Sequence, residues 1–207
     1  MENFNIDSAD VNRLDLYISS LFNKYCSLTK TCISFELAPN QYPYYDVDNI
    51  EDGDLKYREE YVEICIEDAY EIWKQCEFSN DLIVFYEDKY SCHKKNEKEF
   101  VESTLQSLDF REYSFKWKDD DEIYNGVRYI WRTNKINVKE LFRKIILSDI
   151  VENTELDCSV YIIDNKTKNV FFLYDDRGVD VYSDNKKFID KIEQVDKDSE
   201  VFVKNLR

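Results

Sequence analysis

Three aspartates and an arginine, Asp175, Asp176, Asp180 and Arg177, lie close together near the C-terminal end of this 207-residue chain. Carboxylate oxygens are the ligands that divalent cations prefer, and an arginine guanidinium can hold a carboxylate through two hydrogen bonds. However, the spacing matches no calcium-binding loop, and alternation along a strand would point these carboxylates in different directions. Aspartates in tight turns also commonly accept hydrogen bonds from nearby backbone amides. We therefore predict a structural turn without a metal ion, in which Arg177 forms an ion pair.

A second hypothesis keeps a chemical role for the same hairpin. In it, Asp175, Asp176 and Arg177 serve a small enzyme or a ligand-binding domain, with Arg132 beside them. The single histidine, His93, directly follows Cys92, and sequence neighbours do not face each other as a nucleophile and its base must. The chain has no phosphate-binding loop, nucleophile elbow, dinucleotide fingerprint or zinc-protease motif. The sequence therefore predicts no catalytic residues and no cofactor.

The residues around this acidic turn predict a β-hairpin that organises the fold. Residues 170–174 and 179–183 form strand-prone runs, and Asp175-Asp176-Arg177-Gly178 separates them. A turn of this length often ends in a residue with positive φ, which glycine adopts without strain. Gly178 is one of only three glycines in the chain. We therefore expect Gly178 to take a positive φ and to form a β-bulge at the end of the turn.

Hydrophobic periodicity predicts helices and strands along the whole chain. The predicted helices span residues 8–24, 57–75, 91–108, 138–149 and 186–193. Besides the hairpin, the predicted strands span residues 31–37, 82–86, 110–118, 127–132 and 159–163, and residues 201–206 are expected to be helical or irregular. The continuous apolar run at 82–86 is suited to a central strand, and the strand at 127–132 is expected to pair antiparallel with that at 110–118. The fold class is therefore α+β, with an antiparallel sheet rich in hairpins in the C-terminal half, packed by amphipathic helices. No repeat or linker divides the chain, so we expect a single domain over residues 1–207. Within it, the N-terminal half, residues 1–78, is a candidate for a less rigid, softer part.

The net charge of −16 limits the classes of partner. Nucleic acids and anionic membranes bind proteins through clustered basic residues, so both are disfavoured. A basic protein partner would instead be attracted, although acidity that serves only solubility is an equally good explanation. The N-terminus lacks the basic and apolar segments of a secretory signal, and no apolar run is long enough to span a membrane. Together with six cysteines that form no close pairs, these features predict free thiols and a cytoplasmic location.

The strongest charge imbalance falls between residues 46 and 71, which contain eleven acidic residues and only two basic ones, Lys56 and Arg58. Several of the glutamates recur every three or four residues, so they share one face of the predicted helix. Tyrosines flank this stretch, and tyrosine is enriched in protein interfaces. A solvated helix face is the simpler explanation, and a docking surface for a basic partner is the other. The candidate partner-binding residues are Tyr44, Tyr45, Asp52, Glu60, Glu63 and Glu67.

Three stretches of the chain resemble a bacterial family, the domain of unknown function 3885 family. The first covers residues 57–85, and the second joins Tyr129-Ile130-Trp131-Arg132 to a helix that ends in Ser148-Asp149. The third is Tyr174-Asp175-Asp176-Arg177-Gly178-Val179-Asp180-Val181, which matches the family's Y-D-D-R-G-x-D-hydrophobic pattern. The chain departs from the family after the hairpin, where it is rich in lysine and aspartate. The resemblance implies an intracellular bacterial protein with no established activity.

Small acidic proteins of such families are often immunity partners of polymorphic toxins, an association by type and not by motif. We therefore expect a non-enzymatic immunity protein that binds and neutralises a cognate, basic toxin domain. A scaffold or regulator would have the same sequence features. The small-enzyme or ligand-binding hypothesis for the Asp175/Asp176/Arg177 hairpin remains the alternative.

Overall fold

A computed structural model describes residues 32–45, 56–88, 95–119, 122–151, 159–194 and 202–204. The helices are α2 (Glu59–Gln75), α3 (Lys95–Ser103), α4 (Val138–Ile150) and α5 (Lys186–Glu193). The strands are β1 (Cys32–Glu36), β2 (Leu82–Asp88), β3 (Leu105–Asp119), β4 (Glu122–Ile136), β5 (Ser159–Asp164), β6 (Val170–Asp175), β7 (Gly178–Tyr182) and β8 (Phe202–Lys204). The helix predicted over residues 8–24 and the motif Cys92-His93 lie outside the described residues.

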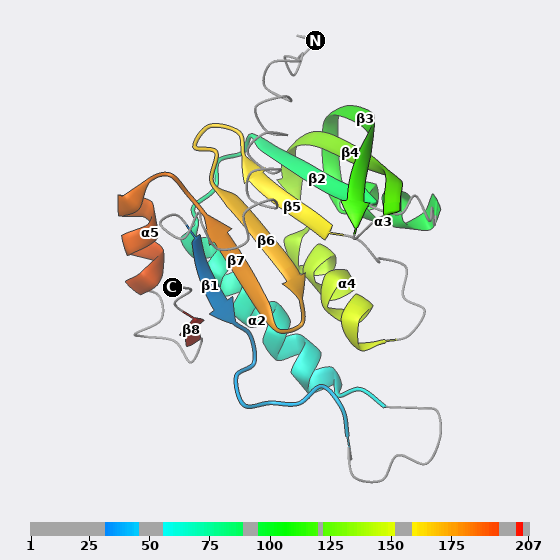
Figure 1. The fold of residues 1–207 in the computed structure, drawn as a ribbon. Helices are drawn as coiled ribbons and strands as arrows, with labels where there is room; N and C mark the ends of the chain where they lie inside the picture. Colours follow the sequence, from blue (N-terminus) through cyan, green and yellow to red (C-terminus); the bar gives the residue numbers. More distant parts are fainter. Residues whose placement is uncertain are drawn as a thin grey trace.

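The described strands form a single sheet in the order β3-β4-β2-β5-β6-β7-β1-β8 (Figure 1). Each neighbouring pair in this sheet runs antiparallel. Short connections join β3 to β4, β5 to β6 and β6 to β7, so hairpins build most of the C-terminal half. The predicted α+β class, with an antiparallel sheet and packed helices, is confirmed. None of the described helices is both long and apolar enough to cross a lipid bilayer.

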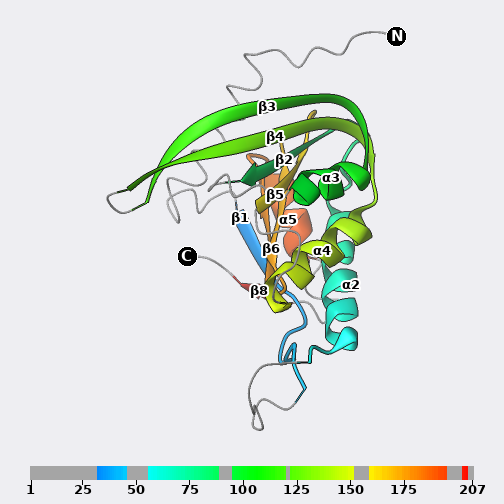
Figure 2. The same ribbon diagram turned by 90° about the vertical axis from the view of Figure 1, so that its right-hand side faces the viewer.

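The helices pack on one face of the sheet, as the side view shows (Figure 2). Their apolar stripes meet the inward side chains of the strands in one large buried cluster. Trp73 of α2 lies edge-on to Phe142 of α4 at 6.4 Å between ring centroids, and Phe142 stacks on Phe171 of β6 at 5.3 Å. Such aromatic pairs add to the free energy gained by burial alone. This cluster fixes α2 and α4 side by side over β6.

Strand β2 is buried on both faces of the sheet. Leu82, Val84 and Tyr86 belong to the cluster beneath the helices, whereas Ile83 and Phe85 belong to a second buried cluster on the opposite face. Side chains alternate along a strand, so a continuous apolar run indicates a central strand with two covered faces. The position of β2 between β4 and β5 confirms that prediction from the sequence.

Two predicted elements differ in type from the structure. The helix predicted to reach Leu108 ends at Ser103, and β3 begins at Leu105. The Thr104 hydroxyl donates to the Val101 carbonyl at 2.8 Å, and the Thr104 carbonyl accepts from the Asn137 amide at 2.6 Å, which redirects the chain into the sheet. Within residues 201–206, expected to be helical or irregular, Phe202–Lys204 pairs with β1 as β8. Pairing with a sheet edge overrides weak local preference in both cases.

Candidate functional site

The predicted hairpin is formed by β6 and β7, and Asp176 and Arg177 alone make its turn. Asp175 pairs with Gly178 across the turn, and Leu173 pairs with Val179. The register shifts by one residue between these two pairs, which is the irregularity of a β-bulge. The bulge therefore lies at Tyr174 on β6, and not at Gly178 as the sequence predicted.

The expected positive φ of Gly178 is also wrong, because its φ lies outside the left-handed region between +20° and +160°. A Cβ atom at this position would instead lie 2.7 Å from the Phe35 carbonyl oxygen and would collide with the Tyr174 ring. Real Cβ atoms essentially never approach backbone oxygen that closely. Close approach of β1 and of the bulged Tyr174 therefore explains the glycine.

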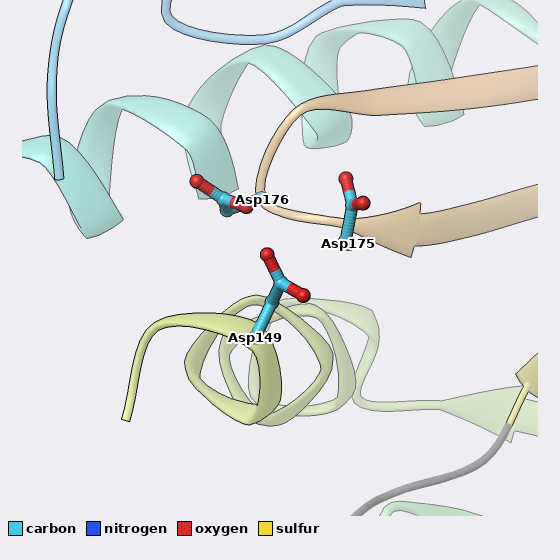
Figure 3. A group of neighbouring side chains, drawn as sticks. All are labelled: Asp149, Asp175 and Asp176. Carbon is cyan, nitrogen blue, oxygen red and sulfur yellow. The ribbon is translucent and has the colours of Figure 1, made fainter. Parts of the chain in front are cut away.

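Three carboxylates converge at the hairpin tip: Asp175, Asp176 and Asp149 near the end of α4 (Figure 3). One oxygen from each lies within 4.8 Å of the others. Asp175 and Asp176 are buried, whereas Asp149 is exposed. The α4 helix places its C-terminal end, which carries partial negative charge, beside this cluster, and its last turn has no basic residue. The tip therefore concentrates negative charge.

Each hairpin aspartate has a specific partner. The Tyr61 hydroxyl of α2 donates to Asp176 Oδ2 at 2.6 Å, and the Cys65 thiol donates to the Asp176 carbonyl at 3.4 Å. The Arg177 guanidinium donates to Asp175 Oδ2 through Nε at 2.8 Å, and the Arg177 amide donates to Asp175 Oδ1 at 2.7 Å. These contacts confirm the predicted ion pair of Arg177 and the turn-stabilising role of Asp175. They also tie the tip to α2.

The protonation of Asp176 follows from these surroundings. The pKa of Asp176 is raised to about 6: burial is the largest cause, the carboxylates of Asp149 and Asp175 add to it, and the Tyr61 hydrogen bond opposes it. Burial also raises the pKa of the Cys65 thiol to about 12, so this cysteine is a neutral packing residue. The hydrogen bonds that Arg177 donates to the Asp175 carboxylate raise the pKa of Arg177, which stays charged. A proton or a cation near Asp176 would relieve the repulsion among the three carboxylates.

The other residues suggested for this site lie elsewhere. Asp180 points to the opposite face of the sheet, where Ser34 and Tyr182 donate to its carboxylate. This separation confirms that strand alternation scatters the hairpin acids. Arg132 binds Asp81 through two hydrogen bonds of 2.7 and 2.8 Å, and not the hairpin. Its expected place beside Asp175 and Asp176 is therefore wrong.

Sequence reasoning did not select Asp149 or Tyr61 as part of this cluster. Both residues fall in predicted helices and in stretches that carry the family resemblance. Their meeting at the hairpin depends on how α2 and α4 pack against the sheet, which local periodicity does not specify.

Three glutamates of the acidic stretch lie along α2 and face α4. Glu59 and Glu63 both pair with Arg143, and Glu67 pairs with Lys139 at 2.5 Å. The three glutamate side chains remain 51–54% exposed. Exposed ion pairs of this kind contribute less than about 1 kcal/mol each. These three glutamates thus form ion pairs with basic residues of the same chain but remain accessible to solvent.

The candidate tyrosines divide between structural and exposed positions. Tyr44 is half-buried, and its hydroxyl donates to the Ile150 carbonyl at the end of α4 at 3.1 Å. Tyr45 is 45% exposed and its hydroxyl donates to Glu60 at 2.9 Å. Tyr42 is 70% exposed in the same segment. Asp52 lies outside the described residues. The structure therefore brings Tyr45 and Glu60 together at the start of α2.

This geometry defines an α+β protein with one antiparallel sheet, a carboxylate cluster at a hairpin tip and an acidic helix beside exposed tyrosines. The chain belongs to the family described as Domain of unknown function (DUF3885), whose match covers residues 20–195. A comparison with curated proteins found no match, and a comparison with solved structures found none either.

Proposed function

We propose that this chain is a non-enzymatic immunity protein that acts in the cytoplasm of a bacterium and neutralises a basic toxin domain. The observation that carries the proposal is the exposed surface at the start of α2, where the Tyr45 hydroxyl donates to Glu60 and Tyr42 is exposed three residues before Tyr45. Exposed tyrosines supply large contact area at low entropic cost, and they are frequent anchors of protein interfaces. We name this set of three residues the tyrosine–glutamate surface.

Charge supports a basic partner for the tyrosine–glutamate surface. The chain carries a net charge of −16, and a potential of this sign raises the association rate of a positively charged protein. Glu59, Glu63 and Glu67 continue the acidic surface along α2. Because their present ion pairs are exposed and weak, a basic partner can exchange with Arg143 and Lys139 at little cost.

The proposal is tested by co-expressing the chain with the protein encoded by the adjacent reading frame and measuring the dissociation constant of the pair. Glu60→Lys should weaken binding by about tenfold or more, because it places a like charge against a basic interface. Glu193→Lys, an equal charge change at the exposed end of α5, is the matched control and should leave binding within about threefold. Equal effects of the two variants would reduce the proposal to non-specific charge attraction.

The ligand-binding alternative retains one observation in its favour, the approach of Asp149, Asp175 and Asp176. Arg132 no longer supports this alternative, because it pairs with Asp81 and not with the hairpin aspartates. Asp175 and Asp176 already accept hydrogen bonds from Arg177 and Tyr61, which gives the cluster a structural role, so partner binding is the function that we propose. Calorimetric titration with Mn²⁺ separates the two hypotheses. Saturable heat that disappears in Asp175→Asn would favour the alternative.

A further inference from the structure

Strand β3 is the long edge of the sheet that the described strands build. The strand order places β3 at one end and β8 at the other, and these edges are 15 and 3 residues long. Among the described strands, β3 pairs only with β4. The outer backbone groups of such an edge form a template for pairing with another strand. A second chain can therefore extend the sheet at β3.

The regular part of this edge begins at Asp109. Two register shifts interrupt the pairing of β3 with β4 between Leu105 and Asp109, and the register is continuous from there to Asp119. β2 supports β4 only over Val127–Thr133, so the far end of the β3–β4 hairpin continues past β2 as a two-stranded ribbon (Figure 2). Bulges protect the first part of the edge against strand addition. The rest of β3 remains suited to it.

The charge of β3 differs from that of the chain. The strand has three acidic and three basic residues, so its net charge is zero in a chain of −16. Two copies of an acidic protein repel each other in general, but this neutral edge is where they can meet. Screening at physiological ionic strength limits the long-range repulsion to about 8 Å.

The charges of β3 are also self-complementary about Phe115. Arg111 and Glu112 precede this residue by four and three positions, and Lys118 and Asp119 follow it by three and four. In an antiparallel pair of β3 strands centred on Phe115, Arg111 stands opposite Asp119, and Glu112 opposite Lys118. The two-fold symmetry repeats both pairs. We propose that this chain forms a homodimer through antiparallel pairing of its β3 strands in this register.

Registers shifted by one residue lack this pairing of opposite charges. A shift of one residue in one direction sets Arg111 opposite Lys118, and a shift in the other sets Glu112 opposite Asp119. Like charges directly opposite each other destabilise a strand pair, whereas opposite charges stabilise it. Parallel pairing in register would place identical charges side by side. The pattern therefore selects one orientation and one register.

Sedimentation equilibrium of the full chain over a range of concentrations tests the dimer, with circular dichroism to confirm that each variant folds. Glu112→Lys or Lys118→Glu alone places like charges opposite each other twice per dimer, and each should raise the dimer dissociation constant by about tenfold or more. The double variant exchanges the two charges and should return the constant to within about threefold. Glu193→Lys on α5 is the matched control and should leave it unchanged.

Three results would overturn the proposal. The first is a wild-type chain that remains monomeric at every concentration. The second is a dimer that neither single variant weakens, because its interface would then lie elsewhere. The third is a dimer that both single variants weaken and the double variant does not restore, because the register would then be wrong.

Discussion

The carboxylate cluster at the hairpin tip makes the stability of the protein depend on pH. Asp176 has a pKa raised from 3.8 to about 6 in the folded chain, first by burial and then by Asp149 and Asp175. The folded state therefore binds more protons than the unfolded state between these two values. The free energy of unfolding contributed by Asp176 falls as pH rises through this window, and below it the destabilisation is absent.

The size of this effect on the free energy of unfolding follows from the pKa shift of Asp176. Each pKa unit corresponds to about 1.4 kcal/mol, so a rise to about 6 corresponds at full effect to about 3 kcal/mol. Water at the exposed Asp149 side screens part of the repulsion, which reduces the expected effect to about 1–2 kcal/mol. Asp176→Asn is neutral at every pH and keeps an oxygen that accepts from Tyr61. Relative to wild type, this variant should become more stable by that amount between about pH 4 and pH 7.

Urea unfolding of both proteins at several pH values measures this difference. Because the two chains share the distant titrating groups, subtraction leaves the contribution of Asp176 together with its coupling to Asp149 and Asp175. Asp190→Asn, which removes an exposed carboxylate of α5 outside the cluster, is the matched control and should not reproduce the gain in stability of Asp176→Asn. If the stability curves of Asp176→Asn and wild type stay parallel from pH 4 to pH 7, the assigned electrostatics of the cluster are wrong.

Three further substitutions test the packing around the site by the same unfolding assay. Gly178→Ala forces a methyl group against the Phe35 carbonyl and should cost about 1–3 kcal/mol; an unchanged unfolding midpoint would refute the close approach. Arg132→Met leaves the partly buried Asp81 carboxylate without its bidentate partner and should cost about 2 kcal/mol, and a loss below about 0.5 kcal/mol would count against that pair. Arg143→Gln removes only exposed ion pairs and should cost less than about 1 kcal/mol, so a larger loss would show that α2 and α4 depend on them.

Much of the fold was predictable because its strands and helices satisfy local patterns. The continuous apolar run of β2 predicted a strand with two covered faces, and alternation predicted the pairing of β3 with β4. The span predicted for α5 agrees with the observed Lys186–Glu193, where the Asn185 side chain caps the helix. These signals arise within a few residues, so no knowledge of distant contacts is needed.

The site was less predictable because its geometry depends on contacts between distant segments. The glycine at position 178 predicted a positive φ. The structure instead requires glycine there because the backbone of Phe35, far away in the sequence, leaves no room for a side chain. Asp149 joins the hairpin only because α4 packs over β6. The glutamates of α2 formed a visible acidic stripe in the sequence, but their bridging by Arg143 and Lys139 depends on the packing of α4. Charge patterns alone do not distinguish a free face from one that is already paired.

The most direct test of the proposed function is growth rescue. Cells that express the protein encoded by the adjacent reading frame would be grown with this chain, with Glu60→Lys or Tyr45→Ala, or with the Glu193→Lys control. The proposal predicts that the adjacent gene product arrests growth, that the wild-type chain and the control restore it, and that both variants of the tyrosine–glutamate surface fail to do so at equal expression. Rescue by Glu60→Lys and Tyr45→Ala equal to that by wild type, or growth that the adjacent gene product never inhibits, would contradict it.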